Sequence, residues 1–340
     1  MKINEIKNWY IEKGKLYFVS LELTQNCNFH CKHCYCADKE HPNMPLENFI
    51  TIIDKLYETG CLFLNFTGGE ILTYKYFKEV YTYAKEKGFI IDLLTNASLI
   101  NSELIELFKL LPPNNIAITI YGTNSEEYCE FTGNENNYHK VMDAIKLLKD
   151  NNINFVLRTV ASKTYINSLM NSSFENIANS FNASFKYEPI IFPKTTGDIT
   201  PLKECLSPSE IVLLEKNNQT RTNAWKKIIV ENKPFKWSCN AGVNSFAIDY
   251  KGFAYVCGLY RNNGISMLLN DISVVMQHLK LIHDTHKTIV KTNFCSKCEL
   301  RNICKWCPAY SNIYNGNDYD KIDFFCELAN ERMKRFGIQE

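Results

Sequence analysis

The chain has 340 residues, 45% of them apolar, which suffices for one large domain or two ordinary ones with a full hydrophobic core. Its 38 basic and 37 acidic residues leave a formal net charge of +1, which argues against a basic surface for nucleic acid or for anionic membranes. The first ten residues lack an apolar signal core, and no stretch approaches the length of a membrane span. We therefore expect a cytoplasmic protein, with no nucleic acid and no membrane among its partners.

Strand-like and helix-like segments alternate over the first two-thirds of the chain. The strand candidates are 16–23, 62–66, 89–94, 116–121, 155–160 and 185–191. Amphipathic helices with apolar residues three and four apart are predicted between them, over 46–57, 76–86, 102–111, 138–149 and 166–179. Repeated βα units imply a parallel sheet with right-handed crossovers, and six units suit a partial barrel that binds its ligands at the carboxyl ends of the strands.

The alternation stops near residue 200. Pro201, Pro208 and the polar run 215–223 indicate a helical linker, and the tail is rich in cysteine and aromatic residues with little periodicity. Such a loop-rich unit needs metal staples in place of a large core. The predicted fold is α/β, a partial (β/α)6 barrel followed by a small loop-rich iron–sulfur domain. The expected parts are an N-terminal extension 1–15, the barrel 16–200, the linker 201–236 and the cluster-binding domain 237–340.

Three cysteines follow the first strand directly. Cys27, Cys31 and Cys34 are spaced Cys-x3-Cys-x2-Cys. Three thiolates on one short loop can bind three irons of a [4Fe–4S] cluster and leave the fourth iron free for a small molecule. A zinc site is the alternative at this point, because His30, His33 and Cys36 offer a fourth ligand. The chain holds 14 cysteines, and in a cytosolic protein clustered cysteines indicate metal ligands more often than disulfides.

The residues after the next strands also have functional character. The second strand runs into Gly68-Gly69-Glu70, the third into Thr95-Asn96 and the fourth into Tyr121-Gly122. Paired glycines let the backbone bend tightly and approach a ligand closely. A glutamate beyond them can accept hydrogen bonds from an ammonium group. By itself Gly-Gly-Glu is more often a plain turn, but its place one βα unit after the cysteine loop favours the functional interpretation.

Together the cysteine loop, Gly68-Gly69-Glu70 and Thr95-Asn96 resemble the radical S-adenosylmethionine (SAM) enzymes. The tail resembles the SPASM extension of that superfamily, which begins with a cysteine and a Gly-x4-Cys and continues with Cys-x2-Cys-x5-Cys. This chain departs from the family pattern at two places. Two residues, in place of the usual three, separate the fifth and sixth SPASM cysteines, and Ile71 occupies a position where proline is common. The matching SPASM cysteines are Cys239, Cys257, Cys295, Cys298, Cys304, Cys307 and Cys326.

The resemblance implies a role for each residue of the first site. Cys27, Cys31 and Cys34 would hold the catalytic cluster, and SAM would chelate its open iron. Glu70, after Gly68 and Gly69, would hold the SAM ammonium group, Asn96 a ribose hydroxyl, and Tyr35 would line the adenine with its backbone. Arg158 on the fifth strand is a candidate for the SAM carboxylate, because a guanidinium grips a carboxylate with two bonds. A surface salt bridge is an equally weighted alternative for Arg158.

The SPASM resemblance implies two auxiliary [4Fe–4S] clusters, so three clusters in all. Cys295, Cys298, Cys304 and Cys326 would hold the distal one. Cys239, Cys257 and Cys307 would hold the inner one, whose further cysteine in some relatives is Lys233 here. The inner cluster would then have an open iron that can bind a substrate thiolate, unless Cys205 reaches it. Of the other cysteines, we expect Cys61 in the core, Cys36 as a bystander, and Cys129 as a packed thiol more readily than a hydrogen donor.

SPASM enzymes act mostly on peptides and proteins. Ile118-Thr119-Ile120-Tyr121-Gly122 resembles the peptide maturases of the sactipeptide and ranthipeptide type, which favours a Cys thioether crosslink in a ribosomal precursor peptide. The alternatives are a C–C crosslink, peptide epimerisation, formylglycine-type oxidation and the modification of a haem or cofactor precursor. About 15 residues precede the first strand, too few for a leader-recognition domain, so we expect a separate recognition protein or direct leader binding, and a flavodoxin or ferredoxin as reductant.

Two hypotheses of other classes stay open. The chain could be a non-enzymatic electron-transfer or scaffold protein, although the Gly-Gly-Glu and Thr-Asn elements argue against it, because an electron carrier has no need to chelate an amino acid. A zinc-ribbon binding module is the third hypothesis. Measured SAM cleavage distinguishes an enzyme from an electron-transfer protein. Iron and sulfide analysis distinguishes an iron–sulfur protein from a zinc-ribbon module.

Overall fold

A computed structural model of the chain describes residues 3–36 and 42–337. Within these residues the strands form one sheet in the order β6-β5-β4-β3-β2-β1-β7-β8-β9. The first six strands are all parallel, and each falls on a predicted strand. Their bounds are β1 Phe18–Thr24, β2 Phe63–Gly68, β3 Ile90–Thr95, β4 Asn115–Thr119, β5 Phe155–Val160 and β6 Phe185–Glu188.

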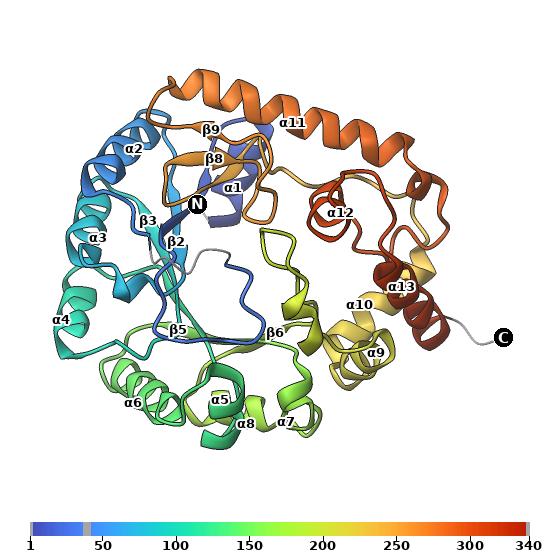
Figure 1. Ribbon diagram of the computed structural model, residues 1–340, viewed down its shortest axis with the longest axis horizontal. Coiled ribbons are helices and arrows are strands. Elements are labelled where there is room, and N and C mark those ends of the chain that lie inside the picture. Colours follow the sequence, from blue (N-terminus) through green and yellow to red (C-terminus); the bar gives the residue numbers. More distant parts are fainter. Residues whose placement is uncertain (1–2, 37–41, 338–340) are drawn as a thin grey trace.

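Helices cover the outer face of this curved sheet and give the molecule the shape of an incomplete ring (Figure 1). The predicted helices appear as α2 Leu46–Glu58, α3 Phe77–Glu86, α4 Ser102–Leu110 and α6 Asn137–Asp150. In α2 the buried residues are Phe49, Ile52, Ile53 and Leu56, whose spacing places them on one face toward the sheet. This parallel βα arrangement confirms the predicted partial barrel.

Three helical segments differ from the prediction. The single helix expected over 166–179 is divided into α7 Ile166–Met170 and α8 Ser173–Ser180, because Ser172 between them adopts a left-handed backbone with φ of 62°. Two further helices, α1 Ile3–Glu12 and α5 Ser125–Thr132, were not predicted. Asn124 caps α5 by accepting a hydrogen bond from the Glu127 backbone N–H. Short 3-10 turns complete the barrel: η1 Ile71–Thr73 and η2 Lys163–Tyr165.

The segment after residue 200 is helical, as expected for the linker. It contains η3 Thr200–Glu204, α9 Pro208–Asn217 and α10 Gln219–Glu231. Helices α9 and α10 pack against α13, Asp323–Phe336, beyond the edge strand β6 (Figure 1). Two residues fix this packing, because the fully buried Arg332 of α13 forms two hydrogen bonds with the fully buried Glu215 of α9, at 2.9 and 2.7 Å.

The cysteine-rich tail is more regular than its sequence suggests. It contributes β7 Ser245–Ile248, which extends the barrel sheet by pairing in parallel with β1, and the antiparallel strands β8 Phe253–Tyr255 and β9 Ile265–Ser266. The remaining elements are α11 Ile272–Thr292, η4 Phe294–Lys297 and α12 Pro308–Asn315. The sheet thus continues past the expected domain boundary at 237. Within the described ranges, no helix combines the length and the apolar character that crossing a membrane requires.

Candidate active site

The cysteine loop begins where β1 ends and rests on the carboxyl end of α5. The backbone N–H groups of His30 and Lys32 donate hydrogen bonds to the carbonyls of Thr132 and Phe131, each at 3.1 Å. Within the loop the Cys34 N–H donates to the Cys31 carbonyl at 3.1 Å, and the Phe29 N–H donates to the Cys27 sulfur at 3.4 Å. A helix that the sequence did not predict therefore supports the loop that holds the three cysteines.

The electrostatics of these thiols fit a bound iron–sulfur cluster. Burial, together with the charges of Glu70 and Cys34, raises the pKa of the Cys27 thiol to about 12. Burial and the charges of Cys27 and Cys34 hold the pKa of the Cys31 thiol well above its ordinary value. Thiolate is the form of cysteine that binds metal, so a bound metal centre would displace the protons of these thiols. The positive charge of the metal would also offset the repulsion among the thiolates.

His33, one of the residues considered for a zinc site, is occupied by ring contacts. Its imidazole stacks on Phe131 with ring centroids 5.2 Å apart and lies 5.4 Å from the ring of Tyr121. Burial lowers the pKa of His33 to about 4, so the ring is neutral at physiological pH. Among the described residues no three His, Cys, Asp or Glu side chains converge as ligands of a single metal ion would.

The paired glycines pack directly against the start of the cysteine loop. The Gly69 N–H donates to the Thr24 carbonyl, and the Glu70 N–H donates to the Asn26 carbonyl, both at 2.8 Å. A β-carbon on Gly68 would lie 2.1 Å from the Thr24 oxygen, and one on Gly69 would lie 2.3 Å from the Asn26 oxygen. Gly68 also has a φ of 149°, which disfavours other residues. Only glycine fits at either position without moving the loop.

Glu70 is fully buried and makes its hydrogen bonds inside the protein. Its carboxylate accepts hydrogen bonds from the Leu72 N–H at 3.0 Å, the Thr95 hydroxyl at 2.6 Å and the Asn96 N–H at 2.6 Å. These contacts tie the turn after β2 to the end of β3. Burial raises the pKa of Glu70 although the three hydrogen bonds lower it. The predicted contact with the SAM ammonium group stays a prediction, and the structure adds a positioning role for this residue.

A cavity of about 260 Å³ lies at the carboxyl ends of the strands, where the partial barrel predicted a ligand. The predicted residues Cys27, Cys31, Tyr35, Gly68, Gly69, Asn96 and Arg158 all line it, whereas Cys34 and Glu70 do not.

Three of these lining residues differ in the contacts that they make. The Asn96 amide donates to the Asn28 side chain at 3.0 Å, and the Tyr35 carbonyl accepts a hydrogen bond from the Thr195 N–H at 3.1 Å. No carboxylate among the described residues lies within ion-pair distance of Arg158, so its guanidinium meets the cavity without a salt bridge.

A second, larger cavity of about 870 Å³ adjoins the first. The two share His33, Tyr35, Val160 and Glu188 as wall residues. The larger cavity extends to Cys239, Cys257 and Cys307, the three cysteines predicted for the inner auxiliary cluster, and much of its wall is apolar or aromatic. The cavity beside the cysteine loop of the barrel and the cavity beside the inner cysteines of the tail are therefore neighbours with a common wall.

The tail cysteines lie in two separate neighbourhoods, and their role as ligands of two clusters stays a prediction. The charges that act on Cys307 include those of Cys257 and Cys239, whereas Cys295 is influenced by Cys304, Cys326 and Cys298. The first group lines the larger cavity and the second does not. Cys205 belongs to neither group, because its charged neighbours are Lys163 and Glu210. The expectation that Cys205 could complete the inner group therefore finds no support in this arrangement.

The other cysteines have separate surroundings. Cys61 is buried in the core, as predicted. Cys36 lies beside the cysteine loop, where its thiol contacts the Gly68 carbonyl at 3.7 Å. Cys129 is exposed on α5 and lines neither cavity, so the packed-thiol interpretation was wrong, and the hydrogen-donor interpretation stays a prediction. A short polar side chain at the free face of an amphipathic helix explains its exposure.

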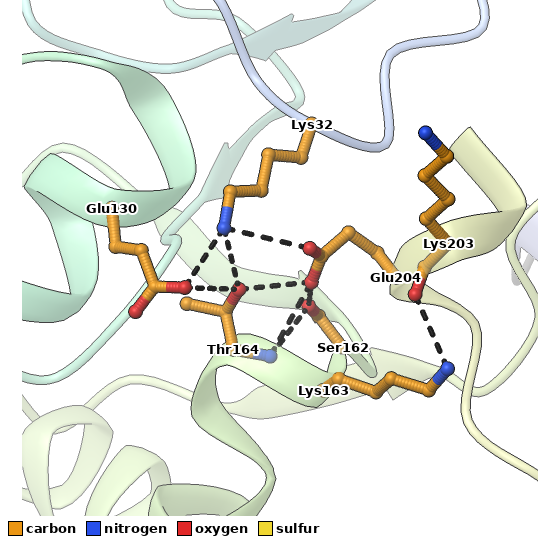
Figure 2. Close-up of polar contacts among 7 residues, drawn as sticks. All are labelled: Lys32, Glu130, Ser162, Lys163, Thr164, Lys203 and Glu204. Atoms are coloured by element: carbon orange, nitrogen blue, oxygen red, sulfur yellow. Dashed lines mark hydrogen bonds and ion pairs between the residues drawn. The ribbon is translucent and has the colours of Figure 1, made fainter. Parts of the chain in front are cut away.

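Lys32, between two of the cysteines, anchors the loop to the rim of the barrel through a polar network (Figure 2). Its ammonium group lies 2.8 Å from Glu130 of α5 and 3.5 Å from Glu204 of η3. Glu204 also accepts hydrogen bonds from the Ser162 hydroxyl at 2.6 Å and the Thr164 hydroxyl at 2.8 Å. Sequence reasoning missed these residues, since no local pattern connects positions 32, 130, 162 and 204.

We expect Glu204→Gln to lower the free energy of unfolding by about 1–2 kcal/mol at pH 7, because it removes an ion pair and charge-assisted hydrogen bonds. Burial opposes ionisation of Glu204, but hydrogen bonds from Ser162 and Thr164 outweigh it and hold its pKa below the ordinary value. A lowered carboxylate pKa stabilises the fold above the unfolded pKa, and this stabilisation is lost as the pH falls through the folded pKa. Urea denaturation should therefore show the difference between the two proteins closing below about pH 4. A difference that persists there would contradict this account.

Comparison with known proteins agrees with the fold. Residues 21–166 match the model of the radical SAM superfamily. The antilisterial bacteriocin subtilosin biosynthesis protein AlbA of Bacillus subtilis is 24% identical over 326 residues, which cover 93% of this chain and 72% of AlbA. An AdoMet-dependent heme synthase of Methanosarcina barkeri is 26% identical over 185 residues, which cover 53% of this chain and 52% of that relative.

A solved structure resembles nearly the whole chain. Streptococcus suis SuiB bound to precursor peptide SuiA superposes with a TM-score of 0.73 at 15% identity, over 94% of this chain and 79% of SuiB. The fold and the matched domain define an enzyme of the partial-barrel type that uses SAM. The chain therefore contains a radical SAM domain over residues 21–166, a domain that binds SAM at a [4Fe–4S] cluster, and its fold is that of SPASM-type enzymes.

Proposed function

We propose that this enzyme is a peptide maturase that forms a thioether bond between a cysteine sulfur and a carbon atom of a ribosomal precursor peptide. The observation that carries the proposal is the pair of adjoining cavities between the cysteine loop and the inner cysteines. A peptide substrate needs a large site with apolar walls, and the cavity of about 870 Å³ offers one. The names of AlbA, a bacteriocin biosynthesis protein, and of SuiB with its precursor peptide give independent support.

The residues of the first cavity bind and orient SAM. Cys27, Cys31 and Cys34 hold the cluster, which when bound supplies the electron that cleaves SAM to methionine and the 5′-deoxyadenosyl radical. Arg158 binds the SAM carboxylate, since its guanidinium faces the cavity without a carboxylate partner in the described part of the chain. Glu70 holds the Thr95-Asn96 segment in place, so that Asn96 meets the ribose.

The residues of the second cavity receive the peptide. Its apolar walls exclude water from the reactive carbon atom, and a water-excluded site prevents side reactions of a radical. Cys239, Cys257 and Cys307 hold an inner auxiliary cluster, and the four distal cysteines hold a second one. A separate leader-recognition protein and a flavodoxin or ferredoxin complete the proposed system, in the cytoplasm.

A second candidate is the modification of a haem precursor. The observation in its favour is the similarity to an AdoMet-dependent heme synthase. The similarity to AlbA extends over 93% of the chain and that to the synthase over 53%, so we place the peptide substrate first.

The test begins with the enzyme reconstituted under anaerobic conditions, reduced with dithionite and incubated with SAM. We expect 5′-deoxyadenosine and about twelve irons per chain, which corresponds to three four-iron clusters. An iron-free protein with bound zinc, or full clusters without any 5′-deoxyadenosine in the presence of peptide, would refute the proposal.

The product separates the possible reactions on a cysteine-containing precursor peptide. A thioether removes two hydrogen atoms and leaves one thiol fewer to react with iodoacetamide. A C–C crosslink removes two hydrogen atoms and leaves every thiol reactive, whereas epimerisation leaves the mass unchanged. Mass spectrometry with and without iodoacetamide therefore distinguishes the thioether from its alternatives.

A further inference from the structure

The wall of the larger cavity carries a group of cations. Arg221 of α10, Lys305 before α12 and Arg332 of α13 all line it. Arg332 is neutralised, because its guanidinium donates two hydrogen bonds to the buried Glu215 carboxylate. Arg332 also lies over the ring of Trp225, with 4.1 Å between the guanidinium carbon and the ring centroid. This buried ion pair fixes the wall on which the other two cations lie.

Arg221 and Lys305 have no such partner. Among the described residues, no carboxylate lies within 4.0 Å of either side chain. Arg221 donates to the Tyr187 carbonyl and lies over the Tyr187 ring at 4.2 Å, and Lys305 lies over the Trp225 ring at 5.4 Å. Aromatic rings hold both cations in place without neutralising their charge.

The two cations also lie close enough to affect each other. Burial lowers the pKa of Lys305 most, and the positive charges of Arg332 and then Arg221 lower it further, whereas Glu215 and, least of all, Glu188 raise it. Two like charges held near each other in a partly apolar cavity are unfavourable unless an anion joins them. The cost of this arrangement indicates a function in binding.

We propose that Arg221 and Lys305 form an anion site that binds a carboxylate of the peptide substrate, an inference that rests on the proposed function. The guanidinium offers paired donors for a carboxylate, and the ammonium group adds a point charge. The carboxylate is that of an Asp or Glu side chain near the modified cysteine, or that of the peptide C-terminus. Glu188, at the junction of the two cavities, would disfavour an acidic group nearer to SAM. The site thus sets the direction of the peptide in the cavity.

Three short peptides test the site in the reconstituted enzyme with SAM bound. The first is acetyl-Ala-Cys-Ala-Glu-Ala-amide, the second has Gln in place of Glu, and the third is the Gln peptide with a free C-terminal carboxylate. Isothermal titration calorimetry should show at least one acidic peptide binding about tenfold more tightly than the neutral amide, the size expected for one charge-assisted contact. The preferred acidic peptide identifies which carboxylate is bound, and the preference should weaken as salt is added.

Matched variants assign the preference to the two residues. Lys305→Gln and Arg221→Gln should abolish most of it, and Arg221→Lys should retain part of it because the charge remains. Lys226→Gln, on the same helix but outside the cavity wall, should keep the full preference. Equal binding of all three peptides, no measurable binding, or a preference that survives Lys305→Gln and Arg221→Gln would overturn the site. Iron content and 5′-deoxyadenosine formation, measured on the same samples, report separately on the proposed function.

Discussion

Replacing Cys31 with alanine is expected to abolish 5′-deoxyadenosine formation and to remove about four irons from each chain. Cys31 is the middle one of three partly buried cysteines on the loop after β1, and its thiol is influenced by both of the others. Without it the remaining two thiols cannot hold a four-iron cluster with one open iron. Anaerobic turnover with SAM, combined with iron and sulfide analysis, measures both effects. The auxiliary clusters should remain, because their cysteines lie in the tail.

Cys36→Ala is the matched control for this loss. Its thiol lies on the same loop, near Cys34 and the Gly68 carbonyl, but it does not line the SAM cavity. We expect the control to keep its irons and its 5′-deoxyadenosine formation. Loss of four irons from Cys36→Ala, with Cys31→Ala unaffected, would assign the cluster to a different set of thiols.

The sequence predicted those parts of the fold that depend on local patterns. Strand-like apolar runs located all six barrel strands, and the helical spacing of Phe49, Ile53 and Leu56 located most of the buried face of α2. Short motifs at strand ends located most of the first cavity, because parallel strands bring their carboxyl ends to one edge. Tyr35, Asn96 and Arg158 are far apart in the sequence, yet they share this cavity.

Features that depend on contacts between distant segments were out of reach. The pairing of β7 with β1 joins residues that are more than two hundred positions apart. The anchoring of Lys32 by Glu130 and Glu204 joins three segments that share no motif. The role of Glu70 was likewise incomplete, since nothing in Gly-Gly-Glu reveals that its carboxylate closes on the end of β3.

The larger cavity shows how the barrel and the tail depend on each other. Its wall combines the cysteine loop at His33 and Tyr35, the end of β6 at Glu188, and the inner cysteines of the tail. The Tyr314 hydroxyl of α12 donates to the Ile191 carbonyl at 2.9 Å, directly after β6. The tail therefore helps to enclose the cavity that we propose for the substrate, beside the proposed SAM site.

Gly69→Ala is expected to weaken SAM binding by at least tenfold and to lower the free energy of unfolding by about 2–3 kcal/mol, as overpacking does. The added β-carbon would lie 2.3 Å from the Asn26 carbonyl oxygen, which accepts the hydrogen bond of the Glu70 N–H. Relief of this clash must move Asn26, which directly precedes Cys27. Calorimetry of SAM binding and urea denaturation of the reconstituted protein measure the two effects.

Gly88→Ala separates crowding from backbone strain. Gly88 has a φ of 90°, so alanine is strained there, but no atom lies within 4 Å of the position of its β-carbon. We expect a loss of only about 1 kcal/mol and unchanged SAM binding. If Gly69→Ala bound SAM as tightly as Gly88→Ala does, the paired glycines would serve only to shape a turn. The contacts argue otherwise, since both glycines meet the backbone of the cysteine loop and line the cavity on their other side. Their absence of side chains lets one strand end position the proposed cluster ligands and the proposed SAM site together.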